Sequence, residues 1–527
     1  MEQSEDRTAR WGVLAAMALT LAVMLPALLV STVFGGDDWA WVWVYRDEGP
    51  ALVQQHLSEA AHPGYGPILN LFFLLGGDIP ARLARGVAFT FHLANGWLVW
   101  RIFRDGQTGP AFSSTVAVLY LMAPFLAGLN HSLAHTMYDV FIFFYLLSIW
   151  LSGSTNALML AGAIVAALIG LSIETLAALE PLRWWYLWQR RGAVRTTVLA
   201  AVPFILVILA LAAVRAIWLV PEGVFAGYNS IKALSAADFE YLAMASLRYL
   251  TNFDPALDLA VKLVRFDSMA LVALLALASA AVGLSAWRAG KRASIGQLGM
   301  LALLGAVVVI VGTAPYIAIG RIPDRGDFSM RFAVVSQFGA LILAATAIEL
   351  AGSRTIKGVV LAAAVFVFSA QQLEFAKWML HEELVLRDYG RQVERYLAST
   401  GDQVLVVQFK PPSKTFLYRN RGCLSSYDNN VGLELAGERH GSFVYDRDCG
   451  PMHYADPNGC RFAGFRAQPC PPVRRSAEFA LKPGMEHFEA FRLAELARRA
   501  IVGPPIEFGT FIPDHAAGSG AAVSETR

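Results

Sequence analysis

The sequence predicts an all-α membrane domain with about eleven transmembrane helices, followed by a small α/β domain. Of the 527 residues, 56% are hydrophobic and only 16% are charged, whereas about a quarter of the residues of a soluble domain are charged. Long apolar runs separated by short polar stretches fill residues 1–375. All four cysteines lie in the polar region that follows. The net charge of +2 and the lack of a basic block argue against nucleic-acid binding.

The first apolar run, residues 11–34, is predicted to be a retained transmembrane helix. It is longer than the apolar core of a signal peptide, and no small-residue cleavage site follows it. Arg7 and Arg10 precede the run, so the positive-inside rule places the N-terminus in the cytoplasm. The loop after this helix is then extracytoplasmic.

Ten further helices are predicted in an order that places most Arg/Lys clusters in the cytoplasm. They cover 83–103, 110–129, 131–151, two helices within 156–188, 197–220, one ending at Trp287, 298–319, one beginning after Arg331, and 358–375. The run 156–188 is too long for one span, so it is split at 173–175, which brings Glu174 to the outer surface. A short interfacial helix is predicted over 68–75, and a mixed loop after Pro221.

Three segments follow from this count: a transmembrane domain (1–375), an extracytoplasmic domain (376–514) and a disordered tail (515–527). A helix over 382–397, a strand over 403–407 and a helix over 485–500 give the second domain its α/β character.

The four cysteines lack the C-x-x-C spacing of zinc sites. In an extracytoplasmic compartment they are predicted to form two disulfides, whose pairing is open among three possibilities. The cysteines are Cys423, Cys449, Cys460 and Cys470.

Two adjacent carboxylates, Asp37 and Asp38, follow the first helix at the water–lipid boundary, where burying charge is expensive. Glycines before them allow a sharp turn, and the aromatic residues after them suit the headgroup layer. A carboxylate beside a second carboxylate, partly shielded by lipid, gains affinity for a proton. The pair is therefore a candidate general base, and which member serves stays open. The alternative is a solvated loop with an aromatic belt.

Three polar residues, His131, His135 and Asp139, are spaced i, i+4, i+8 and share one face of a predicted helix. This spacing would suit a metal, but we favour polar residues that line the mouth of a cavity. His62 is interpreted as a structural or acceptor-contacting residue. No cofactor is predicted, and a divalent metal is left open.

At these positions the sequence resembles the GT-C superfamily of membrane glycosyltransferases, nearest to the protein O-mannosyltransferase and aminoarabinose transferase type. Four passages carry the resemblance: the acidic pair, 62–70, 170–175 and 328–332. Two positions depart from the family pattern, Ile173 where lysine is common and Phe332 where tyrosine is commoner. The C-terminal domain matches no family pattern.

The resemblance implies transfer of a sugar from a polyprenyl-phosphate donor to a glycan, lipid or protein acceptor on the outer face, with inversion. Such a displacement requires a base, which the resemblance assigns to Asp37 or Asp38. It also implies a bacterial inner-membrane protein whose C-terminal domain is periplasmic.

A lipid phosphate as leaving group needs positive charge, and arginine binds phosphate oxygens bidentately. Arg331, Arg325 and Arg321 are the candidates, and the alternatives are lipid headgroups or pairing with nearby aspartates. Glu174 is a candidate for binding the donor headgroup, with a helix cap as its alternative.

Two other functions stay open. A polymerase or ligase of lipid-linked glycans would also need outer-face arginines, but would place its main charged loop late in the chain. A polyprenyl-lipid or sugar transporter should show inverted halves with broken helices in matching positions, and no such halves are found in this sequence.

Overall fold

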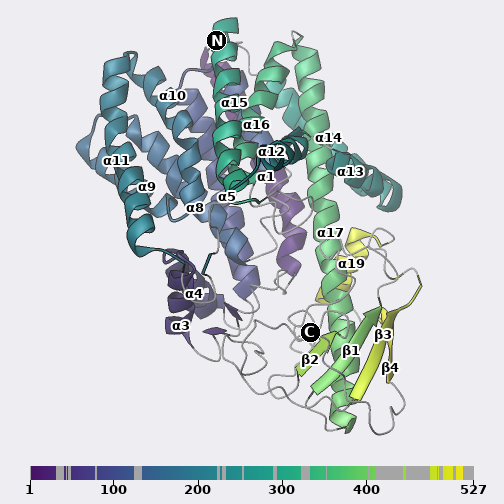
Figure 1. Ribbon diagram of the computed structural model, residues 1–527. Coiled ribbons are helices and arrows are strands. Elements are labelled where there is room, and N and C mark those ends of the chain that lie inside the picture. Colours follow the sequence, from purple (N-terminus) through teal and green to yellow (C-terminus); the bar gives the residue numbers. More distant parts are fainter. Residues whose placement is uncertain are drawn as a thin grey trace. The chain divides into compact units, whose positions relative to one another are not determined.

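The structure is a computed structural model in which two compact units are distinguished (Figure 1). The residues it describes are 2–30, 41–42, 44–45, 49–76, 80–123, 133–221, 226–227, 233–251, 254–288, 293–321, 333–351, 353–400, 404–410, 443–446, 475–483, 485, 491–502 and 506–513. The first unit comprises Met1–Val33 and Pro50–Lys377, and the second comprises Phe34–Gly49 and Trp378–Arg527.

The described part of the first unit is helical. Its elements in chain order are α1 (Glu2–Met24), η1 (Leu25–Leu29), α3 (Pro50–Glu59), α4 (Tyr65–Gly76), α5 (Pro80–Asp105), α6 (Pro110–Met122), α8 (Leu133–Ser152), α9 (Ala157–Gly170), η2 (Glu174–Leu179), α10 (Glu180–Arg191), α11 (Val194–Trp218), α12 (Ala236–Thr251), α13 (Asp254–Phe266), α14 (Met269–Arg288), α15 (Ile295–Ala318), α16 (Val334–Leu350) and α17 (Arg354–Thr400), which continues into the second unit.

Four helices in the described chain are long and apolar enough to cross a bilayer: Arg7–Leu29, Val194–Trp218, Ile295–Ala318 and Arg354–Thr400. Shorter apolar helices, such as Pro110–Met122 and Val334–Leu350, accompany them. The chain is therefore a membrane protein with a mostly helical membrane domain. The predicted number of eleven spans stays a prediction.

The predicted break in the run 156–188 is confirmed. Helix α9 ends at Gly170, and the short helix η2 begins at Glu174. Gly170 lies against the α8 backbone, where an added Cβ would come within 2.9 Å of the Tyr145 amide nitrogen. Any larger residue here would therefore push α9 away from α8.

Two helical segments differ from the sequence prediction. The expected loop after Pro221 contains α12 and α13. Helix α13 is amphipathic, because Ala260 and Leu263 are buried one turn apart while Asp258, two residues before Ala260, is exposed. The two helices expected over 358–375 and 382–397 are one helix, α17. No glycine or proline occurs between Gly358 and Gly390, so nothing in the sequence interrupts it.

Helices α15 and α16 pack with their backbones almost in contact. A Cβ added at Gly339 would lie 2.5 Å from the carbonyl oxygen of Gly305, and one added at Gly312 would lie 2.8 Å from the amide nitrogen of Ser336. Because the obstructing atoms belong to the backbone, no side-chain rotation relieves the clash. Small residues at a helix interface are the usual means of close packing in membranes.

The basic helix ends of the first unit meet at one end of the bundle, here named the basic end. Arg10 near the start of α1 lies 5.5 Å from the Trp97 ring in the last turns of α5. Arg191 at the end of α10 donates to the Ser154 carbonyl just after α8, at 3.0 Å. Gln297 at the start of α15 donates to the Gln107 carbonyl after α5. This arrangement agrees with helices that alternate in direction, while the cytoplasmic side of the basic end stays a prediction.

A charged pair is buried inside the first unit. Arg183 of α10, with no exposed surface, donates through Nε to Glu180 Oε1 at 2.8 Å and through a terminal nitrogen to Ser148 Oγ at 3.0 Å. The Tyr145 hydroxyl donates to the same Glu180 oxygen at 2.5 Å. The guanidinium also lies 3.8 Å from the Phe204 ring centroid. The network joins α8, α10 and α11.

The second unit contains a four-stranded mixed sheet with strand order β2-β1-β3-β4. Its strands are β1 (Val404–Lys410), β2 (Phe443–Asp446), β3 (Arg475–Leu481) and β4 (Gly509–Pro513). Strand β1 runs parallel to β2 and β3, and β4 runs antiparallel to β3. The predicted strand at 403–407 corresponds to β1. In place of a helix over 485–500, the described residues contain α19 (Leu493–Ile501). The four cysteines lie outside the described residues.

The second half of α17 is hydrogen-bonded to β4 and the residue before it through two side chains. Asp388 is 1% exposed, and its Oδ2 accepts from the backbone amides of Phe508 at 2.7 Å and Gly509 at 3.2 Å. Gln392, one turn later, accepts from the Phe511 amide at 3.0 Å and donates to the Gly509 carbonyl at 3.1 Å. The side chains of α17 thus satisfy main-chain groups along β4.

Replacing Asp388 by alanine is expected to destabilise the second unit by about 1–3 kcal/mol, because two buried amides lose their acceptor. Hydrogen exchange at the Phe508 and Gly509 amides should accelerate. Asp388→Asn retains an oxygen acceptor and serves as the matched control with a smaller effect. Unchanged protection in Asp388→Ala would contradict this role.

Candidate functional site

We name the end of the first unit that is opposite the basic end the loop end. Here η1, α11 and α15 finish, and α5 and η2 begin. The turn between α3 and α4 packs here. A Cβ added at Gly64 would lie 2.6 Å from Ser172 Oγ, and one added at Gly66 would lie 1.9 Å from Gln54 Oε1. Gln54 donates to the Pro63 carbonyl at 3.1 Å. A side chain at Gly64 or Gly66 would therefore displace Ser172 or Gln54 from its position in this turn.

His62 is held in this turn by its backbone and its ring. Its amide donates to the Leu57 carbonyl at 2.7 Å, and its ring centroid lies 5.2 Å from that of Tyr65. Tyr65 is buried, contacts Phe141 of α8 and is hydrogen-bonded to Tyr138. The structure thus connects His62 to the beginning of α8.

Glu174 forms an ion pair with Arg215, with 2.8 Å between Oε2 and a terminal guanidinium nitrogen. The carboxylate is the first residue of η2, and Arg215 lies in the last turn of α11. Next to Glu174, Thr175 accepts a hydrogen bond from the Tyr316 hydroxyl at 3.1 Å. The two side chains of the ion pair are 42% and 29% exposed, so the pair adds little stability and remains accessible to a ligand.

These residues form one polar cluster, defined as Tyr65, Tyr138, Glu174, Arg215 and Tyr316. Burial raises the pKa of the Tyr65 hydroxyl well above its usual value, and the nearby Tyr138, Glu174 and Tyr316 raise it further. Tyr65 therefore stays protonated. The cluster places hydroxyl, carboxylate and guanidinium groups at the end of an apolar bundle. These hydrogen-bond donors and acceptors suit a ligand rich in hydroxyl groups.

Two arginines at the start of α5 hold the end of η1. Arg82 donates to the Leu29 carbonyl at 2.9 Å, and buried Arg85 donates to the Val30 carbonyl at 2.6 Å. Each guanidinium has five N–H donors, so the bond to Leu29 occupies only one donor of Arg82. Arg82 is exposed. A positive charge therefore lies at the end of η1.

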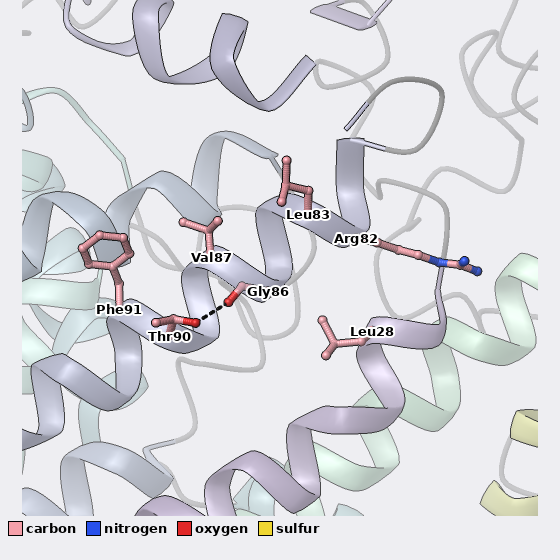
Figure 2. A pocket seen from close by; sticks show the side chains of 7 residues that line it. All are labelled: Leu28, Arg82, Leu83, Gly86, Val87, Thr90 and Phe91. Atoms are coloured by element: carbon pink, nitrogen blue, oxygen red, sulfur yellow. Dashed lines mark hydrogen bonds between the residues drawn. The ribbon is translucent and has the colours of Figure 1, made fainter. Parts of the chain in front are cut away.

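An apolar groove begins beside Arg82 (Figure 2). It has a volume of about 480 Å³ and is lined by Leu28 of η1 and by Arg82, Leu83, Gly86, Val87, Thr90 and Phe91 of α5. The Thr90 hydroxyl donates to the Gly86 carbonyl at 2.9 Å, so its hydrogen is used within the helix. The groove is thus hydrocarbon-like along its length, with a guanidinium at one end.

Asp139 lies inside the bundle rather than with the polar cluster. It is 1% exposed, and its Oδ1 is 3.2 Å from His92 Nδ1. Asn95 donates to the Asp139 carbonyl at 2.9 Å, and the His92 ring stacks on Tyr120. The pair joins α5 to α8. Its partner His92 was missed by the sequence analysis, because nothing in the sequence of α5 pairs it with a residue of another helix.

Several predicted site residues lie outside the described residues: Asp37, Asp38, Arg325, Arg331 and His131. For His135 the structure describes only the helix. Arg321 is exposed at the loop end, where its amide donates to the Tyr316 carbonyl at 2.8 Å. Of the predicted residues, His62, Glu174 and Arg321 are therefore at the loop end.

Three arginines that matter at the loop end were not predicted: Arg82, Arg85 and Arg215. Arg215 is a single charged residue within a long apolar run, and such residues usually have a partner or a functional role. That signal would have found it. Among the described residues no group of His, Cys, Asp or Glu has a metal-binding arrangement.

The chain matches no protein-family model, no curated protein and no solved structure. The resemblance to GT-C glycosyltransferases stays a prediction.

Proposed function

We propose that this chain is a membrane glycosyltransferase that moves a sugar from a polyprenyl-phosphate donor to an acceptor at the extracytoplasmic face. The observation that carries the proposal is the apolar groove with Arg82 at its end. A polyprenyl phosphate has the matching form, a long hydrocarbon chain that ends in an anion. Arginine is well suited to the phosphate because its charge is permanent and its N–H groups pair with two oxygens.

In the proposed reaction the acceptor hydroxyl oxygen attacks the anomeric carbon of the donor sugar. The bond between that carbon and the phosphate oxygen breaks, and its electron pair leaves with the polyprenyl phosphate. The proton of the acceptor hydroxyl passes to the carboxylate of Asp37 or Asp38. In the sequence both aspartates come after the first predicted helix.

The polar cluster is proposed to bind the sugar. The Glu174–Arg215 pair offers donors and acceptors at partly exposed positions, whereas the Tyr65 and Tyr316 side chains are buried. Arg321, Arg325 and Arg331 are proposed to add positive charge for the leaving phosphate. Two disulfides among the four cysteines, a bacterial inner-membrane location and a periplasmic second unit belong to the same proposal.

Filling the groove tests the donor part of this proposal. An added Cβ at Gly86 meets no atom within 4 Å, so Gly86→Phe is expected to occupy the groove without disturbing the bundle. Transfer from polyprenyl-phosphate sugars should fall at least about tenfold, since hydrocarbon burial contributes about 0.8 kcal/mol per CH₂. Gly86→Ala is the matched control and is expected to retain activity, because alanine also favours a helix.

The assay uses the purified full-length protein in lipid nanodiscs, a panel of radiolabelled polyprenyl-monophosphate sugars and membrane extract as acceptor. Formation of a labelled product together with free polyprenyl phosphate is the expected result. Consumption of polyprenyl-diphosphate glycans alone would instead identify a polymerase or ligase. Movement of the lipid between leaflets without bond cleavage would identify a transporter, and either result overturns the proposal.

A further inference from the structure

A second apolar groove lies at the basic end, between α10, α11 and α15. It has a volume of about 330 Å³. Its lining includes Trp184 and Trp188 of α10, Val194 and Val198 of α11, and Leu303 of α15. Val194 is 72% and Leu303 is 65% exposed. Helix α11 is a candidate membrane span, and only 17% of its apolar 18-residue segment is buried within the protein. The groove therefore opens toward lipid.

Three arginines lie in or next to the turn between α10 and α11, at one end of this groove. Trp184, Trp188 and Arg191 follow one another at i, i+4 and i+7 and so share one face of α10. Val194 lines the groove and is the first residue of α11, so the turn that carries Arg191 closes the groove. Arg190 and Arg195 flank this turn and are exposed.

Arg191 retains hydrogen-bonding capacity. One terminal nitrogen donates to the Ser154 carbonyl at 3.0 Å. Within the part of the chain that the structure describes, its buried Nε has no hydrogen-bond partner. The sequence contains no acidic residue from Pro181 to Pro221, so no carboxylate of these helices neutralises the three arginines. The N-terminus of α11 adds its unpaired amides, because Ala193 at the N-cap has no side-chain acceptor.

We infer that this groove binds an anionic phospholipid of the surrounding bilayer. One acyl chain lies between the tryptophans and Leu303, and the phosphate contacts Arg191 with Arg190 and Arg195 around it. A zwitterionic lipid fits the apolar wall equally well, but its positive headgroup meets three arginines. Charge complementarity therefore selects a net negative headgroup, and tryptophan rings are suited to the interfacial depth at which a headgroup meets its chains.

The site is independent of the proposed glycosyl transfer. Helix α11 runs from Val194 at the basic end to its last turn, where Arg215 pairs with Glu174 at the loop end. The two grooves thus lie at opposite ends of the bundle, and a variant in one leaves the other unchanged.

Native mass spectrometry of the detergent-purified full-length protein provides the test. Phosphatidylglycerol and phosphatidylcholine with identical acyl chains are titrated separately. Phosphatidylglycerol is expected to bind at least about tenfold more tightly, and Arg191→Gln should weaken it about tenfold, as for loss of one charge-assisted hydrogen bond. Arg265→Gln, at another exposed arginine, is the matched control and should bind like the unaltered protein.

Val198→Trp fills the groove and should reduce binding of phosphatidylglycerol, whereas Leu206→Trp, at an exposed α11 position outside the groove, should not. Free glycerol phosphate at the same concentration should fail to displace the lipid. Equal affinity for the two lipids, full binding in Arg191→Gln, or displacement by glycerol phosphate would each overturn the proposal. The comparison of lipids needs only the unaltered protein, so poor folding of a variant does not prevent a decision.

Discussion

Replacing the catalytic member of the Asp37–Asp38 pair by asparagine is expected to lower sugar transfer about a hundredfold to ten-thousandfold. Asparagine has nearly the same shape as aspartate but cannot accept the proton of the acceptor hydroxyl. Folding should be unaffected, because the change removes a charge at a membrane boundary where charge is costly. Initial rates with saturating donor, measured for Asp37→Asn and Asp38→Asn separately, identify the base.

The affinity of each asparagine variant for the donor is measured together with its turnover. If one aspartate is the base, its variant loses turnover while its affinity for the polyprenyl-phosphate donor changes little. Gly86→Phe should show the reverse, weakened donor binding with turnover recovered at high donor concentration. Near-normal rates in both asparagine variants would exclude the pair as base, even if the groove binds the donor.

The largest expected effect on stability comes from the buried pair Glu180–Arg183. Replacing Arg183 by leucine should lower the free energy of unfolding by about 3–5 kcal/mol, because a buried carboxylate is left without its counter-charge. Glu180 is 7% exposed, and Tyr145 can supply only one hydrogen bond. The loss of stability is measured as a lower midpoint of thermal unfolding in detergent, monitored by the helical circular dichroism signal.

Two controls separate the buried charge from general damage. The double variant Glu180→Gln/Arg183→Met removes both charges and should recover a substantial part of the loss. Asp258→Asn breaks the exposed pair with Lys262, in which Asp258 is 63% exposed, and should cost no more than about 1 kcal/mol. A double variant as unstable as Arg183→Leu would show that packing, rather than unpaired charge, dominates.

Composition and periodicity were sufficient to predict the helical membrane domain and most of its helices. The break at Glu174 was predictable because one run was too long to cross a bilayer once. The strand at β1 was predictable from its run of valine and leucine. Such features depend on local sequence, so they can be read without knowledge of the partners.

The contacts between helices could not be predicted from the sequence. Helical periodicity places Asp139 on a helix face, but only the packing of α5 on α8 brings His92 to it. Similarly, Glu174 was a candidate by position, whereas its ion pair depends on where α11 ends. Arg82 was not predicted because its contact is with a main-chain carbonyl at the end of η1. Pairing across helices is decided by the whole bundle.

The contact between α15 and α16 has a consequence for divergence. At Gly305, Gly312 and Gly339 a Cβ would meet main-chain atoms of the opposite helix. Mutations elsewhere on these helices can be absorbed by side-chain movement, but these three positions cannot change without separating the pair. Any distant chain that retains this packing must therefore keep two glycines about two helical turns apart and a third on the facing helix. That spacing would outlast overall sequence identity as a mark of common descent.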